Sequence, residues 1–190
     1  MPKRSDEYMN ERRAEILDAL LRCVERQGWT ATTIDHVAAE AGLSKGAVYT
    51  HFRNKTALLE GLLDRGMAEA SRNYAEATDK AAFRRLMTDH MNQLCGSDTP
   101  RLVAGHMEAM LDGMRHPDLR KRIDQAMHEI IELNRATIAR LNPALSPAEQ
   151  RQKAILLLLL LEGLRSYRVS TDAYTKADME ALFDRLIDDI

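Results

Sequence analysis

Residues 32–59 constrain the fold of this chain more than any other stretch, because they read as two short helices joined by a tight turn. Thr32 or Thr33 can cap the first helix, in which apolar residues recur at helical spacing. Gly42 stands where a left-handed residue ends that helix, and Ser44 can cap the second one. This succession predicts a compact helical unit with an apolar face turned inward and a polar face turned outward.

The outward face of the second helix combines small, hydroxyl-bearing and cationic side chains. No acidic residue occurs between Ala41 and Leu59, and Gly46 and Ala47 leave little bulk in the first turn of the helix. Such a helix can enter a DNA major groove, while cations, hydroxyls and backbone N–H groups hold the phosphates. From spacing alone, the alternative is a solvated surface on a helical bundle.

The residues around this helix resemble the DNA-binding half of a known family. The run GLSKGAVYTHFRNKTALL, preceded by TTIDHVAAEAG and by an amphipathic helix that ends at Gly28-Trp29, is similar to the corresponding part of the TetR family of transcriptional regulators. The resemblance covers about the first third of the chain. It implies a homodimer that binds a palindromic DNA operator, represses transcription, and leaves the DNA when a small molecule enters its second domain.

The resemblance also implies which residues contact DNA. The predicted set is Thr33, Ser44, Lys45, Gly46, Ala47, Tyr49, Thr50, His51 and Lys55. By position, the residues that would hold the DNA backbone are Thr33, His51 and Lys55, and those that would face bases or adjacent phosphates are Lys45, Gly46, Ala47, Tyr49 and Thr50. His36 departs from the family pattern, since many relatives carry an acidic residue near this position. The departure puts the cap of the first motif helix in question, but not the fold.

The remaining pattern predicts an all-α protein of nine helices, because no strand pattern occurs after residue 81. We expect a three-helix DNA-binding domain with a helix-turn-helix over residues 1–53, and a helical ligand-binding and dimerisation domain over residues 54–190. A long helix over about residues 54–77, capped by Asn54, would connect the two as a lever.

Helix ends in the second half are marked by capping residues, glycine and proline. The predicted boundaries are Cys95-Gly96, Thr99-Pro100, His116-Pro117, a capping box from Ser146 to Glu149, and an opening from Thr175 to Asp178.

The leucine-rich run over residues 154–161 is apolar on every face. A helix that is hydrophobic all round must be buried all round, so its second face needs a partner surface. We expect another copy of the chain to supply that surface, through an isologous interface of the eighth and ninth helices. The two recognition helices would then lie about 34–36 Å apart, one turn of DNA. The alternative is a central helix within a monomeric bundle.

We expect the interior of the second domain to be adaptable in shape, because methionine side chains are flexible. The chain has ten methionines but only three phenylalanines and one tryptophan. Helical periodicity predicts inward stripes on the fifth helix and, from Val103 to Met114, on the sixth. We expect a pocket for a small, largely apolar effector, lined by Phe83, Met87, His90, Met91, His106, Met107, Met110, Met127 and Arg165. Methionine at this spacing is also typical of plain core, and that alternative stays open for each of them.

His90 and His106 are the polar groups of most interest on these stripes. They could bond a ligand, bond each other or a backbone carbonyl, or bind a metal together with Glu108. Because the histidines occur one per helix without a nearby cysteine cluster, we predict no metal site and no cofactor. Arg165 could pair with Glu162 or meet a ligand carboxylate.

Charge, cysteine content and hydropathy narrow the function classes. A net charge of −2 means that any DNA binding comes from local patterning. Cys23 and Cys95 lie far apart without a signal peptide, which favours a reducing cytoplasm. The apolar run at 154–161 is much shorter than the ~18 residues of a membrane span.

An enzyme and a DNA-binding protein without a small-molecule ligand are the two other function classes. The sequence contains no Gly-rich phosphate loop, nucleophile elbow or metal-ligand spacing, so we do not expect an enzyme. The alternative within DNA binding is a regulator that has no small-molecule ligand and is controlled by a protein partner.

Overall fold

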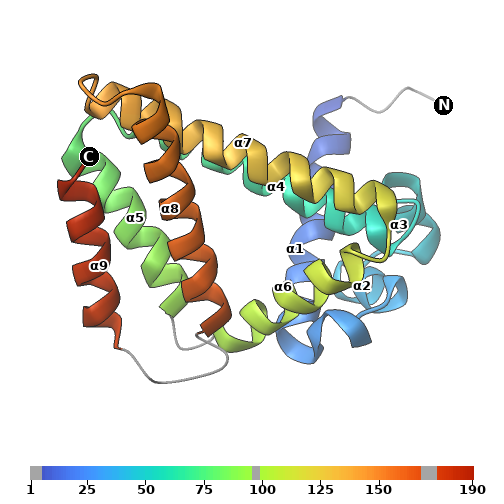
Figure 1. The fold of residues 1–190 in the computed structure, drawn as a ribbon. Coiled ribbons are helices and arrows are strands. Elements are labelled where there is room, and N and C mark those ends of the chain that lie inside the picture. Colours follow the sequence, from blue (N-terminus) through green and yellow to red (C-terminus); the bar gives the residue numbers. More distant parts are fainter. Residues whose placement is uncertain (1–5, 96–98, 168–174) are drawn as a thin grey trace.

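The computed structural model describes residues 6–95, 99–167 and 175–190, and within them it contains nine α-helices and no strand (Figure 1). The predicted all-α fold is confirmed. The helices are α1 (Asp6–Ala31), α2 (Ile34–Glu40), α3 (Lys45–His51), α4 (Lys55–Glu76), α5 (Lys80–Cys95), α6 (Thr99–Gly113), α7 (Pro117–Leu141), α8 (Pro147–Tyr167) and α9 (Lys176–Asp188). None of these helices is both long and apolar enough to cross a bilayer.

The helices gather around two hydrophobic clusters at opposite ends of the molecule (Figure 1). The amino-terminal cluster joins α1, α2, α3 and the first half of α4, and it includes Ile16, Val48 and Phe52. The carboxyl-terminal cluster joins α5, α8, α9 and parts of their neighbours. Helix α4 contributes to both, with Leu58 in the first cluster and Tyr74 in the second. The expected domain boundary between residues 53 and 54 stays a prediction.

Helices α4 and α7 run side by side between the two ends (Figure 1). Arg140 on α7 donates through Nη2 to the backbone oxygens of Tyr74 and Ala77, at 3.0 and 2.9 Å, where α4 ends. Toward the other end of the pair, Arg122 donates through Nε to Asp64 Oδ1 at 2.8 Å. These contacts hold α4 along α7.

Most helix boundaries follow the local capping signals. Asn54 Oδ1 accepts from the backbone N–H of Ala57 at 2.8 Å and caps α4 as expected. Glu149 and Ser146 form the predicted capping box, with Glu149 Oε2 accepting from the Ser146 N–H at 2.8 Å. Thr175 and Asp178 do the same for α9. A cap needs only groups a few residues apart, and for that reason the sequence is sufficient to predict it.

The predicted inward stripe of α6 divides between the two clusters. Val103 lies in the carboxyl-terminal cluster, whereas Ala109 lies in the amino-terminal cluster, with Met110 packed against it. The inward placement of Met114 was wrong, since that side chain is 65% exposed at the end of the helix. Helix α6 therefore joins the two halves instead of forming one wall of the second.

Candidate nucleic-acid interface

Helix α3 is held from behind by apolar packing. Val48 and Phe52 are fully buried in the amino-terminal cluster. On the other side of the helix Lys45, Tyr49 and Thr50 are exposed, and Tyr49 keeps 46% of its surface accessible. Ser44 and Gly46 are exposed as well, while Ala47 is half-buried. The structure thus gathers the predicted base-facing residues on one accessible face.

Local hydrogen bonds order this short helix. The Ser44 hydroxyl oxygen accepts from the backbone N–H of Ala47 at 3.1 Å, which caps the helix. The Thr50 hydroxyl donates to the Gly46 carbonyl oxygen at 3.0 Å. Lys45 is 2.9 Å from Asp35 on α2, in an exposed ion pair of the kind that contributes little to stability. Asp35 on α2 therefore lies next to the exposed face of α3, which has no acidic residue of its own. The sequence did not predict this contact, because Asp35 lies outside the run without acidic residues.

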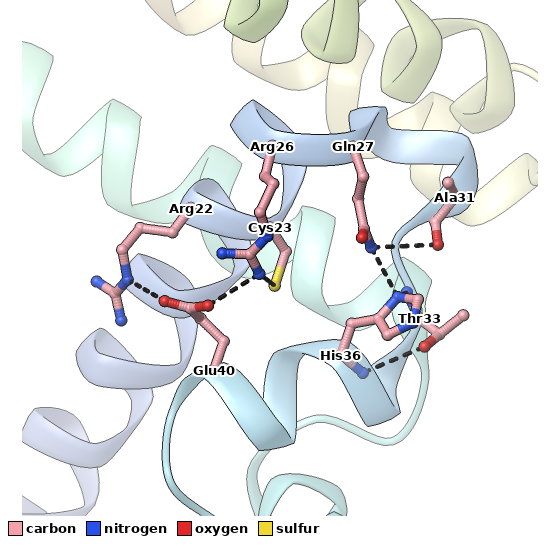
Figure 2. Close-up of polar contacts among 8 residues, drawn as sticks. All are labelled: Arg22, Cys23, Arg26, Gln27, Ala31, Thr33, His36 and Glu40. Atoms are coloured by element: carbon pink, nitrogen blue, oxygen red, sulfur yellow. Dashed lines mark hydrogen bonds and ion pairs between the residues drawn. The ribbon is translucent and has the colours of Figure 1, made fainter.

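The cap of α2 forms in spite of the histidine that stands in place of an acidic residue (Figure 2). The Thr33 hydroxyl oxygen accepts from the His36 N–H at 3.2 Å, and His36 Nδ1 accepts from the Thr33 N–H at 3.3 Å. Gln27 Nε2 lies 2.6 Å from the same imidazole nitrogen. An unprotonated Nδ1 can accept both hydrogen bonds, so imidazole replaces the usual carboxylate. Of the two threonines considered, Thr33 is the cap.

Ion pairs tie the other end of α2 to α1 (Figure 2). Arg22 Nε and Arg26 Nη2 donate to the two carboxylate oxygens of Glu40, at 2.8 and 2.9 Å. Hydrogen bonds from Arg22 and then Arg26 hold the pKa of Glu40 below its ordinary value. Cys23 lies buried in the amino-terminal cluster, and burial raises the pKa of its thiol. The side chain of Cys95 lies outside the described set.

Arg13 on α1 holds the far end of α3, a role that was not anticipated. Its Nη1 donates to the His51 carbonyl oxygen at 2.8 Å, and its guanidinium lies 4.4 Å from the centre of the Phe52 ring. A carbonyl in the last turn of a helix has no partner within the helix, so Arg13 satisfies it and fixes where α3 ends. Because the contact joins residues 13 and 51, which lie far apart in the sequence, no local sequence pattern predicts it.

We expect Arg13→Met to weaken binding to all DNA sequences about tenfold, because α3 loses its orientation. The loss of a charged hydrogen bond should also lower the free energy of unfolding by roughly 1–3 kcal/mol. Denaturant unfolding and fluorescence anisotropy with labelled duplex measure the two effects. Arg12→Met, which removes the neighbouring arginine that contacts Tyr8 and Glu15 on its own helix, is the matched control. Equal losses in both variants would exclude the proposed role of Arg13.

Lys55 faces the protein, unlike the exposed residues of α3. Its Nζ donates to the Trp29 carbonyl oxygen at 2.5 Å and lies 4.3 Å from the centre of the Trp29 ring. Burial lowers the pKa of Lys55, against the opposing charges of Asp112 and Glu108 on α6. The expected phosphate contact of Lys55 stays a prediction, and it requires this side chain to turn outward.

The predicted effector residues fall into separate environments. Phe83, Met87 and Met91 are fully buried within the carboxyl-terminal cluster, Met110 packs toward the amino-terminal cluster, and Met107 and Met127 are half-buried. His90 lines an open groove of about 460 Å³ between α4 and α5. The described residues contain no group of three His, Cys, Asp or Glu side chains that could hold a metal.

His106 and Arg165 meet inside the second half of the molecule. Arg165 Nη1 donates to His106 Nε2 at 3.0 Å and also to Glu162 Oε1 at 3.1 Å. Burial, with the Arg165 charge adding to it, lowers the pKa of His106 to about 4. His90 is likewise shifted to a lower pKa by burial and then by Arg165. The imidazole of His106 is therefore neutral at physiological pH and accepts a hydrogen bond at Nε2.

Asn134 on α7 is a further polar group of this interior, and the sequence gave no reason to single it out. Its side chain is fully buried, and neither amide atom has a hydrogen-bond partner among the described residues. An unpaired buried polar group costs roughly 1–3 kcal/mol. Such a group favours the entry of a molecule that can pair with it.

We expect the free energy of unfolding to fall as the pH drops from 6.5, the ordinary pKa of histidine, to about 4, the pKa of His106 in the folded chain. Between these values the unfolded chain binds more protons, so acid favours unfolding by up to roughly 3 kcal/mol. Denaturant titrations across this pH range measure the slope. In His106→Gln the slope should shrink, leaving the share of His90; an unchanged slope would contradict the assignment.

The sequence of this chain is similar to those of known bacterial regulators. Residues 16–62 match the family model described as bacterial regulatory proteins, tetR family. The HTH-type transcriptional regulator TtgR of Pseudomonas putida is 34% identical over 100 residues, which cover 50% of this chain and 48% of TtgR. The regulator BetI of Burkholderia thailandensis is 29% identical over 163 residues, 80% of this chain and 79% of BetI. The chain spans about half the length of TtgR.

Solved structures share the fold over almost the whole chain. A putative TetR-family transcriptional regulator from Mesorhizobium loti has a TM-score of 0.73 at 18% identity, and the match covers 99% of this chain and 96% of that one. The regulator FadR from Bacillus subtilis, solved in complex with stearoyl-CoA, has a TM-score of 0.66 at 18% identity, with 92% and 95% covered. At such low identity these matches show the fold alone.

Proposed function

We propose that this chain, whose residues 16–62 match the TetR family of bacterial transcriptional regulators, is a homodimeric repressor. It binds a palindromic DNA operator and leaves it when a small, largely apolar effector binds the second domain. Its site of action is the cytoplasm, where operator DNA lies. Residues 1–53 form the DNA-binding domain in this proposal, and residues 54–190 bind the effector and the second copy.

The exposed face of α3 is the observation that carries the DNA-binding proposal. Lys45, Tyr49 and Thr50 project from a helix whose other side is locked by Val48 and Phe52. Rigid presentation lets side chains reach base edges in the major groove without first being ordered. Thr33, Ser44, Gly46, Ala47 and His51 surround them and place hydroxyl and backbone N–H groups near the phosphates.

Exposed leucines support the homodimer. Leu156 and Leu159 on α8 are 53% and 62% exposed in the single chain, and Leu182 on α9 is 47% exposed. The opposite side of α8 is buried, with Leu157 fully covered. Large apolar side chains on adjoining surface helices indicate an interaction site, and a two-fold interface of α8 and α9 would cover them.

The polar groups of the interior support effector binding. His106 and Arg165 are hydrogen-bonded near His90, and Asn134 is fully buried without a hydrogen-bond partner among the described residues. An effector with an apolar body and one polar end could pair with these groups. Because α6 carries His106 and also packs on α1, effector binding there would reach the DNA-binding domain.

A regulator controlled by a protein partner is the second candidate. It is favoured by Phe83, Met87 and Met91, which are packed in the carboxyl-terminal cluster and leave little room for a ligand beside them. A screen of small molecules for release from DNA separates the two. Release by a compound that also raises the melting temperature supports the repressor with an effector.

Selection from a random duplex library tests the DNA-binding proposal itself. Purified protein should enrich fragments with inverted half-sites whose centres are about one helical turn, or a multiple of it, apart. Failure to enrich any sequence, together with no binding to duplex at low ionic strength, would overturn the proposal.

A further inference from the structure

Helix α6 contacts the two functional halves of the molecule through different residues. His106 accepts a hydrogen bond from Arg165 on α8. The preceding residue, Gly105, packs against α1 so closely that a Cβ at this position would lie 2.3 Å from Val24 Cγ1. Helix α6 therefore contacts both the interior of the second half and α1.

Two carboxylates of α6 hold the last turn of α1, which follows the kink at Gly28. Glu108 Oε2 accepts from the backbone N–H of Thr30 at 2.8 Å, and Asp112 Oδ2 accepts from Trp29 Nε1 at 3.1 Å. Gly28, with a φ of 81°, lets the chain leave the helix here, and a Cβ at this position would lie 3.3 Å from both carboxylate oxygens of Glu108. The turn is thus shaped to receive these carboxylates.

Lys55 is bound to the same turn from the other side. Its ammonium donates to the carbonyl oxygens of Trp29 and Thr30, at 2.5 and 3.5 Å, and lies above the indole ring. The negative charges of Asp112 and Glu108 act on this ammonium as well. Three helices, α1, α4 and α6, therefore meet at one small polar cluster, made of Trp29, Thr30, Lys55, Glu108 and Asp112.

We propose that Lys55 has two competing partners, this polar cluster held by α6 and a DNA phosphate, so that Glu108 and Asp112 set DNA affinity without touching DNA. The inference rests on the proposed DNA-binding function and names a regulatory contact within it. While α6 holds the turn, Lys55 has an internal partner that a phosphate must replace. When Lys55 turns to a phosphate, the turn loses a cation and α6 is held less tightly.

The two bound states bias each other, because a shared group cannot satisfy both partners at once. A change at His106 or Arg165 that draws α6 away from α1 would free Lys55 for DNA. A change that presses α6 onto α1 would keep Lys55 in the polar cluster and away from DNA. Glu108 and Asp112 are positioning residues in this scheme, and their effect on DNA passes through Lys55.

A double-mutant cycle on the full-length protein tests the exchange. Glu108→Gln with Asp112→Asn keeps a hydrogen-bond acceptor at each position and removes both charges. With Lys55 present, we expect these changes to tighten binding to a random-sequence duplex about three- to tenfold at constant salt. With Lys55→Met, the same changes should alter affinity by less than about twofold. Asp118→Asn, an exposed carboxylate on the first turn of α7, is the control for general charge effects.

The outcomes separate the inference from the function on which it rests. Equal tightening in the presence and absence of the lysine would mean simple charge repulsion from DNA, and would overturn the exchange while leaving DNA binding intact. Tighter DNA binding that requires Lys55 would support the proposed exchange. Absence of any duplex binding by the unaltered protein at low salt would overturn the proposed function first.

Trp29 provides a second readout, because it is the only tryptophan of the chain and is almost fully buried. Its emission should change when duplex DNA is added, as the Lys55 ammonium leaves the ring. The change should be absent in Lys55→Met, provided that circular dichroism shows the variant folded. Identical changes in both proteins, or no change in the unaltered protein while it binds DNA, would overturn the exchange.

Discussion

Replacing Leu156 and Leu159 by glutamate should convert the proposed dimer to monomers and weaken operator binding by roughly 10²-fold or more. Both leucines are exposed in the single chain, so each protomer should keep its fold. Four glutamates brought together across a two-fold interface would have to lose water next to apolar side chains, which costs several times more than the leucines contribute. Each half-site would then be bound alone, without the gain from linking two recognition helices.

Sedimentation velocity and operator titrations measure the two parts of this prediction. Leu111→Glu is the matched control, since Leu111 on α6 is 61% exposed but lies off α8 and α9. The control should remain dimeric with unchanged operator affinity. A dimer that survives the double change would place the interface elsewhere, whereas an unaltered protein that is itself monomeric would favour the monomeric bundle.

Replacing Tyr49 by alanine should relax the sequence preference of the protein. The exposed ring of Tyr49 stands on the face of α3 that the proposal places in the major groove. Losing a base-facing side chain should cost about 1–3 kcal/mol on the selected operator and little on random duplex. The ratio of specific to non-specific affinity, measured at one salt concentration, is the relevant quantity.

Tyr49→Phe separates the two parts of the side chain. If the ring contacts a base or a thymine methyl group, phenylalanine keeps most of the discrimination. If the hydroxyl binds a phosphate, phenylalanine loses affinity for all sequences alike. Undiminished discrimination in Tyr49→Ala would show that the exposed face of α3 has been assigned to the wrong groove or the wrong partner.

Helix α2 shows what a local sequence pattern can predict. The sequence left open whether Thr32 or Thr33 caps the helix, and the histidine at position 36 raised a doubt about the cap. In the structure Thr33 is the cap and the imidazole takes part in it. The cap depends on side chains within three residues of one another. The doubt about it arose because only a carboxylate was expected to accept a hydrogen bond at position 36, whereas the imidazole of His36 also accepts one.

Helix α6 shows where the same reasoning stops. Its periodicity identified a continuous apolar stripe from Val103 to Met114, but not that the stripe meets two different clusters. Nor could it reveal that Asp112 faces Trp29, more than a third of the chain away. Periodicity specifies which residues share a face, whereas the identity of the facing helix depends on how the helices dock.

The sequence by itself determined the helices, most of their caps and the resemblance of the amino-terminal part to a family of regulators, because these depend on groups that lie close together in the chain. Only the tertiary structure decided that Lys55 faces Trp29, that Arg13 holds the end of α3, and that Asn134 is buried without a partner among the described residues. Each of these facts depends on how closely two helices approach, and that distance is set by side chains distant in the chain, as at Gly105 against Val24.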